Sequence, residues 1–241
     1  MKYLEERNIG FDVGLTKVPL VCQSCLFDLT VGDAFARPDK EMGYEVCVNA
    51  EKFNYQDGNF GAGTGATVGK ISGMERCMKS GIGSYALQIG ELKVGAVVAV
   101  NSLGDIYNYE TGEKVAGLIS DDKKTFLSTD EVLYKNYSAR ENKFIENGNT
   151  TLAVVLTNAA FKKSNLCKIA DMAHDGYARS IKPVHTTADG DSIYAVSLGN
   201  LIADQDIVGT LVAQVVSEAI LRAVYSAESD YGYVSAKDLE K

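Results

Sequence analysis

The chain has 241 residues, of which 46% are hydrophobic and 23% are charged, and its formal net charge is −8. This length and composition are typical of a globular domain, while the acidic balance argues against nucleic-acid partners and against a polybasic membrane patch. The most apolar stretch, 207–224, is interrupted by Gln214, Glu218 and Arg222, so we expect no membrane span there. Five cysteines are too few for a disulfide scaffold and no secretory signal is visible, so we expect a cytoplasmic protein.

The first half of the chain predicts two helices and two strands. Residues 1–10 predict a short helix, and residues 39–51 predict a second helix with Asp39 as its N-cap. The apolar run 18–29 and the valine-rich run 94–100 both predict buried strands.

The second half begins with a long polar segment, 120–149, which predicts an exposed loop. Ser164 is the expected cap of the first helix that follows it. Apolar runs and helical spacing predict, in order, a strand at 150–159, a helix at 164–181, a strand at 192–200 and a helix at 206–227. Strands covered on both faces by helices predict a layered α/β domain.

Two motifs resemble known binding sites but fail in their spacing. Gly63 and Gly69 enclose five residues, whereas a phosphate-binding loop needs four, and no strand precedes them as the dinucleotide fingerprint requires. Cys22 and Cys25 have the spacing of half a zinc site, but no second pair follows, so we interpret them as small residues in a buried strand. We therefore expect neither a metal nor an organic cofactor.

The two histidines are interpreted as structural residues. His174 lies on the predicted helix 164–181 and His185 follows its end, and no serine–histidine–aspartate spacing accompanies them.

The junction at 147–151, Asn-Gly-Asn-Thr-Thr, allows two interpretations. Asn-Gly makes tight turns, so the segment could simply open the next strand. However, a polar loop that ends at a hydroxyl residue and opens a buried strand is also how N-terminal nucleophile hydrolases are built. In these enzymes the hydroxyl cuts the chain before itself and gains a free α-amine, whose pKa of about 7.7–8.0 suits a general base.

Several segments together resemble the L-aminopeptidase/D-esterase family, which includes β-peptidyl aminopeptidases and nylon-oligomer hydrolase. In the family's order they are VPLVCQSCLFDLTVGD (18–33), RPD (37–39), GAGTGATVGK (61–70), MKSGIGS (78–84), VGAVVAVNSLGD (94–105), NTTLAVVLTNA (149–159), MAHDGYARSIKPVHTTADGD (172–191) and RAVYSA (222–227). The resemblance implies an αββα sandwich of the N-terminal-nucleophile type. It also implies a single domain, 1–241, that cuts itself at 149/150 into a large subunit, 1–149, and a small subunit, 150–241.

The resemblance also implies roles for individual residues. Thr150 matches the nucleophile, and Asn149 would become the new C-terminus. Asn101 matches the asparagine that helps to bind the oxyanion, and Lys70 matches a residue that assists the nucleophile. The remaining pair, Asp189 and Asp191, matches the residues that orient the nucleophile's amine and hydroxyl, although the same residues could be a surface turn.

The implied activity is hydrolysis of small amino-acid amides, esters or short peptides without a cofactor, by a protein that self-associates into a homo-oligomer. Family members carry about eighty further residues before the segment that matches Met1. Two alternatives stay open: acyl transfer to an amine, as in ornithine acetyltransferases, and an inactive homologue that acts as a binding or scaffold protein.

Overall fold

The computed structural model describes residues 1–137 and 148–239. They form two compact units, which we describe separately. The small unit comprises Met1–Cys25 and Asp33–Gln56, and the large unit comprises Leu26–Gly32 and the described residues from Asp57 onward.

The small unit contains two helices and one short hairpin. Its elements are α1 (Lys2–Glu6), β1 (Phe11–Asp12), β2 (Lys17–Val18) and α2 (Lys40–Ala50). The Tyr44 ring meets the Tyr3 ring edge-on at 5.5 Å, and the Tyr44 hydroxyl donates to the Glu6 carboxylate at 2.7 Å. The predicted cap of α2 is confirmed, because the Asp39 carboxylate accepts the Met42 N–H at 2.8 Å.

The strand predicted over 18–29 is wrong. After β2 the segment has no regular structure, and Leu20 is 74% exposed. Cys22 and Cys25 are also exposed, so they are not the buried strand residues that we expected. Pro19 has no N–H to offer a strand ladder, and an apolar run alone does not establish pairing.

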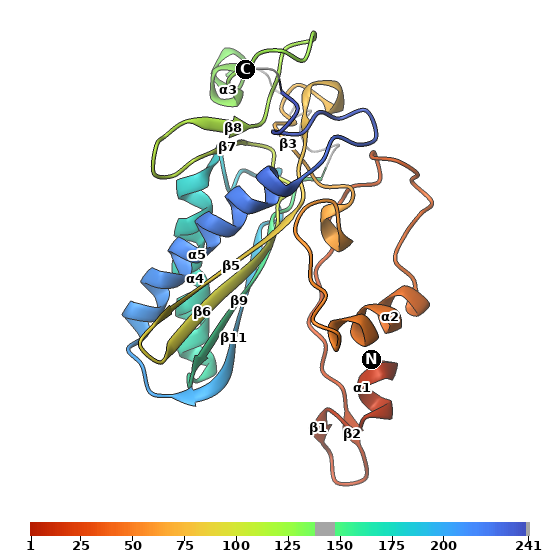
Figure 1. Ribbon diagram of the computed structural model, residues 1–241, viewed down its shortest axis with the longest axis vertical. Coiled ribbons are helices and arrows are strands. Elements are labelled where there is room, and N and C mark those ends of the chain that lie inside the picture. Colours follow the sequence, from red (N-terminus) through yellow and green to blue (C-terminus); the bar gives the residue numbers. More distant parts are fainter. Residues whose placement is uncertain (138–147, 240–241) are drawn as a thin grey trace. The chain divides into compact units, whose positions relative to one another are not determined.

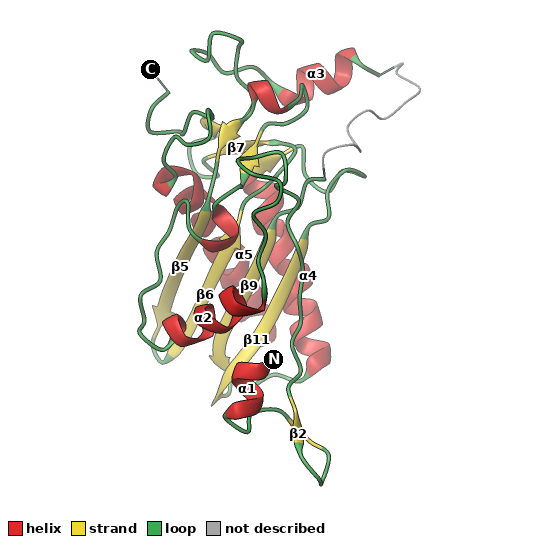
Figure 2. Cartoon of the chain, turned by 90° about the vertical axis from the view of Figure 1, so that its right-hand side faces the viewer, coloured by secondary structure: helices red, strands yellow, loops and turns green. Residues whose placement is uncertain are grey.

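A four-stranded sheet with the order β11-β9-β6-β5 forms the centre of the large unit (Figure 2). Its strands are β5 (Ile82–Ile89), β6 (Leu92–Ala99), β9 (Leu152–Ala159) and β11 (Ser192–Leu201). β6 pairs antiparallel with both β5 and β9, whereas β9 and β11 are parallel and are connected through a helix. The predicted strands at 94–100, 150–159 and 192–200 are confirmed as β6, β9 and β11, with ends displaced by one or two residues.

Two long helices, α4 (Lys163–Ser180) and α5 (Gln205–Ser226), lie on the same side of this sheet (Figure 1). Both helices were predicted, but α4 has Lys162 rather than Ser164 at its N-cap, without a side-chain cap. Asp204 caps α5 by accepting two backbone N–H groups. By length and composition α5 could cross a membrane, yet 67% of its most apolar window is buried within the protein, as in a core helix.

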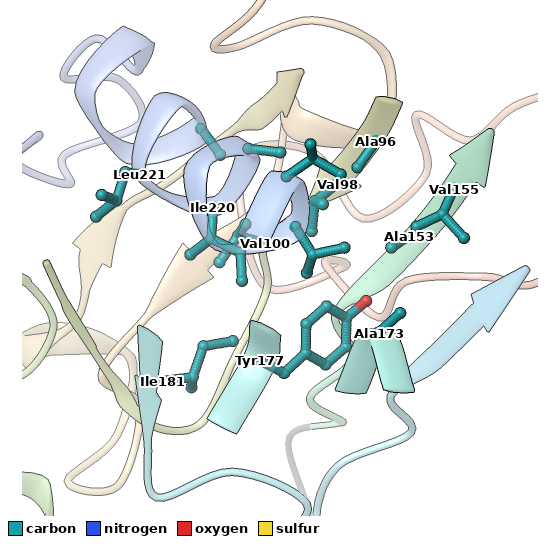
Figure 3. Packing of buried hydrophobic residues seen from close by; sticks show 14 of the residues in the cluster. Ala96, Val98, Val100, Ala153, Val155, Ala173, Tyr177, Ile181, Ile220 and Leu221 are labelled. Carbon is teal, nitrogen blue, oxygen red and sulfur yellow. The ribbon is translucent and has the colours of Figure 1, made fainter. Parts of the chain in front are cut away.

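The hydrophobic core lies between these helices and the sheet. Figure 3 shows Tyr177 and Ile220 from the helices packed beside side chains of β6 and β9. Close packing requires glycine at Gly176, because an added Cβ would lie 2.5 Å from the Ala213 carbonyl oxygen of α5. Strand β5 approaches α5 even more closely at Gly83, where a Cβ would lie 2.2 Å from the Ala219 oxygen.

Shorter elements surround the sheet and include part of the segment predicted as a loop. They are η1 (Gly61–Gly63), β3 (Thr67–Val68), η2 (Met74–Arg76), β4 (Met78–Lys79), β7 (Asp105–Tyr107), β8 (Lys114–Ala116), α3 (Thr129–Lys135) and β10 (Ile181–Lys182). The presence of α3 corrects the loop predicted over 120–149, of which 138–147 lie outside the described residues. Ser128 caps α3 by accepting the Glu131 N–H at 3.3 Å, and Ser-x-x-Glu is the sequence signature of a helix start.

Candidate active site

The Asn149–Thr150 junction lies where strand β9 begins. A parallel bridge between Asn149 and Asp189 extends the β9–β11 pairing back across this junction. The Asn149 N–H donates to the Ala188 oxygen at 3.2 Å, and the Gly190 N–H donates to the Asn149 oxygen at 2.7 Å. The carbonyl that precedes Thr150 is therefore held, and polarised, by a backbone donor.

Thr150 is fixed on both sides by short contacts. Its hydroxyl donates to the Asn149 carbonyl oxygen at 2.6 Å, and its N–H donates to the Asn101 carbonyl oxygen at 2.9 Å. Gly190 leaves room for this hydroxyl, because an added Cβ would lie 2.9 Å from the Thr150 Oγ.

Asn101 is buried just after strand β6 and binds through both ends of its side-chain amide. Its Oδ1 accepts the Lys70 Nζ at 2.8 Å and the Thr67 N–H at 3.2 Å, and its Nδ2 donates to the Phe27 carbonyl oxygen at 3.2 Å. Two donors on one atom define which end of the amide is oxygen. The Asn101 amide N–H groups are thus directed away from Lys70.

Lys70 is 5% exposed and donates from Nζ to both oxygens of Asn101, at 2.8 Å to Oδ1 and 3.2 Å to the carbonyl oxygen. Burial lowers the pKa of Lys70 to about 8, and the nearby Cys77 thiol and the carboxylates of Asp189 and Asp28 oppose this shift. The Asn101 carbonyl oxygen therefore receives both the Lys70 ammonium and the Thr150 N–H.

The two aspartates reach the junction through backbone groups. One oxygen of Asp191 accepts the Thr151 N–H at 2.8 Å, and burial raises the pKa of this carboxyl. Asp189 accepts the Thr186 hydroxyl at 2.6 Å and N–H at 3.0 Å on one oxygen, and the Leu103 N–H at 3.4 Å on the other. Residues 189–191 are therefore not an isolated surface turn, since Asp191 binds Thr151 just before β9 and Asp189 binds Leu103 in the loop between β6 and β7.

The predicted residues therefore lie together. Lys70, Asn101 and Thr150 meet at one carbonyl oxygen, while Asp189 and Asp191 flank the junction. The sequence did not indicate Gly190, whose N–H donates a hydrogen bond to the Asn149 carbonyl oxygen. The Asp-Gly-Asp run at 189–191 was the available signal, because glycine permits the close approach of another part of the chain.

The two histidines, which the sequence interprets as structural residues, contact each other, and His185 also contacts Asp191. The His185 Nδ1 lies 2.9 Å from the second oxygen of Asp191, and the His185 Nε2 lies 3.2 Å from the His174 Nδ1. Among the described residues, no group of three or more histidine, cysteine or acidic side chains is arranged to hold a metal ion.

Comparison with known proteins supplies the family. The model of peptidase family S58 matches residues 1–236. An uncharacterized aminopeptidase of Mycobacterium leprae is 34% identical over 253 residues, which cover 96% of this chain and 68% of the relative. A 6-aminohexanoate-oligomer endohydrolase of Agromyces sp. is 26% identical over 231 residues, covering 90% of this chain and 64% of that enzyme.

Solved structures agree on the fold. A Pyrococcus horikoshii protein superposes with a TM-score of 0.55 and 22% identity, over 94% of this chain and 60% of its own. The L-aminopeptidase D-Ala-esterase/amidase of Ochrobactrum anthropi, described as a variant of the Ntn hydrolase fold, gives a TM-score of 0.50 and 19% identity, over 80% and 55%. The predicted α/β fold of the N-terminal-nucleophile type is confirmed, although the chain spans only about three fifths of these structures. The chain belongs to peptidase family S58.

Proposed function

We propose that this chain is an N-terminal-threonine hydrolase that cuts itself at 149/150 and then hydrolyses small amino-acid amides, esters or short peptides. The observation that carries the proposal is the Asn149 carbonyl oxygen, which the Gly190 N–H holds at 2.7 Å while the Thr150 hydroxyl lies 2.6 Å away. A nucleophile beside a polarised carbonyl is the arrangement that acyl transfer needs.

Self-cleavage begins with attack of the Thr150 Oγ on the Asn149 carbonyl carbon. The C–N bond breaks, the Thr150 nitrogen takes up the hydroxyl proton, and the acyl group is left as an ester on Oγ. The Gly190 N–H stabilises the oxyanion that forms in this step, because it already donates to the oxygen on which the charge develops. Water then hydrolyses the ester, which leaves a carboxylate on Asn149 and a free amine on Thr150.

In the cut protein the Thr150 amine is the general base for its own hydroxyl. The Thr150 nitrogen and the Lys70 Nζ both donate to the Asn101 carbonyl oxygen, at 2.9 Å and 3.2 Å respectively. A cation so close disfavours a second positive charge, so Lys70 lowers the pKa of the amine and keeps it in the neutral form that accepts a proton.

Asn101 is the proposed side-chain donor to the oxyanion of the substrate. Its Nδ2 donates to the Phe27 carbonyl oxygen at 3.2 Å, so a substrate carbonyl must share or replace that acceptor. Exchange of a neutral acceptor for a developing oxyanion strengthens the hydrogen bond in the transition state more than in the ground state.

Thr150 variants test the proposal directly. Thr150→Ala should abolish both the cut after Asn149 and hydrolysis of a panel of aminoacyl 4-nitroanilides, as measured by mass spectrometry and by release of nitroaniline. Thr150→Ser keeps the hydroxyl and the amine, so it should retain part of each activity. An uncut 241-residue chain that hydrolyses these substrates as fast as the cut one would overturn the role of the amine.

Thr151→Ala is the matched control. Its N–H, which Asp191 binds, belongs to the backbone and is kept in this variant, so Thr151→Ala should still be cut at 149/150. Cleavage at 150/151 instead would show that the adjacent hydroxyl is the nucleophile.

Two alternative functions are outcomes of the same assays. Transfer of the acyl group to added amino acids, in preference to water, would show an acyltransferase. An uncut chain without turnover, whose Thr150 resists acylating probes, would show a binding or scaffold protein.

The proposal includes self-association and a cytoplasmic location. Leu15, Phe35 and Phe53 of the small unit are each more than 80% exposed, and exposed apolar side chains favour association. All five cysteines are free thiols, which suits a reducing compartment. Sedimentation at micromolar concentration should therefore show a species heavier than 25.9 kDa.

A further inference from the structure

His185 contacts Asp191 on the side opposite Thr151, and His174 contacts His185 in turn. His174 is on helix α4, and His185 follows the short strand β10, so the two rings come from different elements. Their ring nitrogens lie 3.2 Å apart, and the His185 Nδ1 lies 2.9 Å from the Asp191 Oδ2. The Tyr177 ring packs edge-on to the His174 ring and lies 5.9 Å from the His185 ring.

Asp191 stands in for a backbone acceptor. The parallel pairing around Asn149 would direct the Thr151 N–H to the Gly190 carbonyl oxygen. Instead the Asp191 Oδ1 accepts this N–H at 2.8 Å, and the Ser192 hydroxyl occupies the Gly190 oxygen at 3.2 Å. The position of the peptide between Thr150 and Thr151 therefore depends on the orientation of one carboxylate.

The histidine pair restrains this carboxylate. The Asp191 side chain is only 4% exposed, and it binds the Thr151 N–H through one oxygen and His185 through the other. The His185 ring is 38% exposed, so it connects a buried carboxylate to solvent. An ionised carboxylate only accepts hydrogen bonds, so the His185 Nδ1 carries the proton in this contact.

Only one proton can lie between the two rings. If both rings were imidazolium ions, the His185 Nε2 and the His174 Nδ1 would both carry hydrogen and their contact would be lost. Burial and the nearby charge of His185 lower the pKa of His174, against the opposing carboxylates of Asp171 and Asp175. Of the two rings, His174 is therefore the one that disfavours a positive charge, and His185 is the one next to Asp191.

We propose that His174 and His185 form a positioning pair that orients Asp191, and through Asp191 the peptide that follows the nucleophile Thr150. This inference rests on the proposed function, because it assigns the pair to the reaction of Thr150. Both histidines act through Asp191 and touch neither Thr150 nor the scissile carbonyl in the hydrogen bonds described above.

The pair also determines how the site responds to acid. Burial and the Asp189 carboxylate raise the pKa of Asp191, whereas the Thr151 N–H and the charge and hydrogen bond of His185 lower it. Lys70 faces both carboxylates from the loop after β3, and Tyr177 faces Asp191 from α4. Loss of His185 removes two of the opposing causes, so Asp191 would become protonated at a higher pH.

The backbone at His185 allows a matched pair of variants. Its φ is +55°, a left-handed conformation that favours glycine and that asparagine tolerates better than most residues. His185→Gly removes the side chain without backbone strain. His185→Asn restores an amide N–H near the position of Nδ1, so a comparison of the two isolates the donor to Asp191.

The experiment measures the cut at 149/150 in the full chain, made by cell-free synthesis and transferred to buffers from pH 5 to 9. His185→Gly should slow the cut by about 10- to 100-fold, as expected for loss of one hydrogen bond to a charged group. The acid limb of its pH profile should move to higher pH. His185→Asn should recover most of the rate at pH 8 and shift the limb less.

A merely structural role predicts a different result. His185→Gly and His185→Asn would then lower the melting temperature, but the rate of the cut per folded molecule and its pH profile would match those of the wild type. That result would overturn the proposal, as would a slower cut in His185→Asn than in His185→Gly.

A second measurement does not depend on catalysis. In protein labelled with ¹⁵N-threonine, His185→Gly should shift the Thr151 amide resonance and accelerate its hydrogen exchange, whereas His185→Asn should leave both close to wild type. If the proposed function is wrong, Thr150→Ala will be cut normally, although His185→Gly still shifts the Thr151 amide resonance. Failure of the positioning pair would appear as an unaltered Thr151 amide in His185→Gly.

Discussion

The large unit contains two buried lysines whose surroundings differ in kind. Burial lowers the pKa of Lys70 and of Lys79 to about 8 in both cases, and both side chains donate to backbone carbonyls. Lys79 donates to three carbonyl oxygens, those of Gly63, Ala66 and Ser80, at 2.9, 3.2 and 2.6 Å.

Lys70 instead donates to two oxygens of a single residue, Asn101, whose carbonyl also receives the Thr150 N–H. An ammonium has three protons, so the three carbonyls use the full donor capacity of Lys79, whereas the contacts of Lys70 lead to the candidate nucleophile. A lowered pKa is thus a property of burial in both places, and the neighbours of each ammonium separate a structural cation from a functional one.

The largest effect should follow from Lys79→Met. This change leaves three buried carbonyl oxygens without their ammonium donor, at about 1–3 kcal/mol each, so we expect a loss of at least about 3 kcal/mol in the free energy of unfolding. Denaturation by urea measures it. Folded Lys79→Met should keep the wild-type rate of self-cleavage, and a folded but inactive variant would contradict a purely structural role.

Asn101→Ala should lower kcat by about 10²- to 10³-fold with little change in KM, because the Nδ2 donor acts on the oxyanion rather than on the bound substrate. Steady-state kinetics on the cut enzyme measures both constants. Asn101→Asp is the isosteric control, since it keeps an acceptor for Lys70 and loses the N–H donor. An unchanged kcat with a raised KM would remove Asn101 from the oxyanion role.

Lys70→Met should reduce kcat by about tenfold at pH 6, since the Thr150 amine then loses the nearby cation that keeps it neutral and becomes protonated. The melting temperature should change less than in Lys79→Met, because fewer buried acceptors lose their donor. If the two variants lose stability equally and Lys70→Met has no specific loss of rate, Lys70 is a structural cation like Lys79.

The smallest effect concerns pH. Because the pKa of Lys70 is about 8, its ammonium is charged throughout the acid limb of the kcat profile, where it keeps the Thr150 amine neutral. That acid limb should therefore lie at higher pH in Lys70→Met than in the wild type, whereas in Lys70→Arg, which stays charged, it should lie near the wild-type position. Acid limbs at the same pH in Lys70→Met and the wild type would show that the charge on Lys70 is not needed.

The strands and helices with strong periodicity could be predicted from the sequence. The apolar runs of β6 and β9 and the helical stripes of α4 and α5 are long, and local pattern and tertiary packing agree there. The segment after Val18 was misassigned because apolar composition does not reveal whether a partner strand exists. Helix α3 was missed in a polar segment, although Ser128 and Glu131 form a helix-start signature.

The residues of the candidate site could be predicted only where they belong to a segment that resembles the family. Asn101, Thr150 and Asp191 are separated by dozens of residues, and their proximity depends on the order of β6, β9 and β11 in the sheet. The contact between His174 and His185 depends on how the second half of α4 lies against the segment after β10, which no spacing rule encodes. The three carbonyls around Lys79 are backbone atoms, so side-chain identities could not indicate them.

The β6–β9 pairing has a consequence for reassembly. β6 lies before the proposed cut and β9 after it, and eight-residue strands from the two pieces pair as direct neighbours in one sheet, with α5 packed across both β5 and β6. A cut at 149/150 would therefore release no fragment from the native protein. Once unfolded, however, the pieces would have to meet by diffusion, so refolding would become second order and the apparent melting temperature would rise with protein concentration.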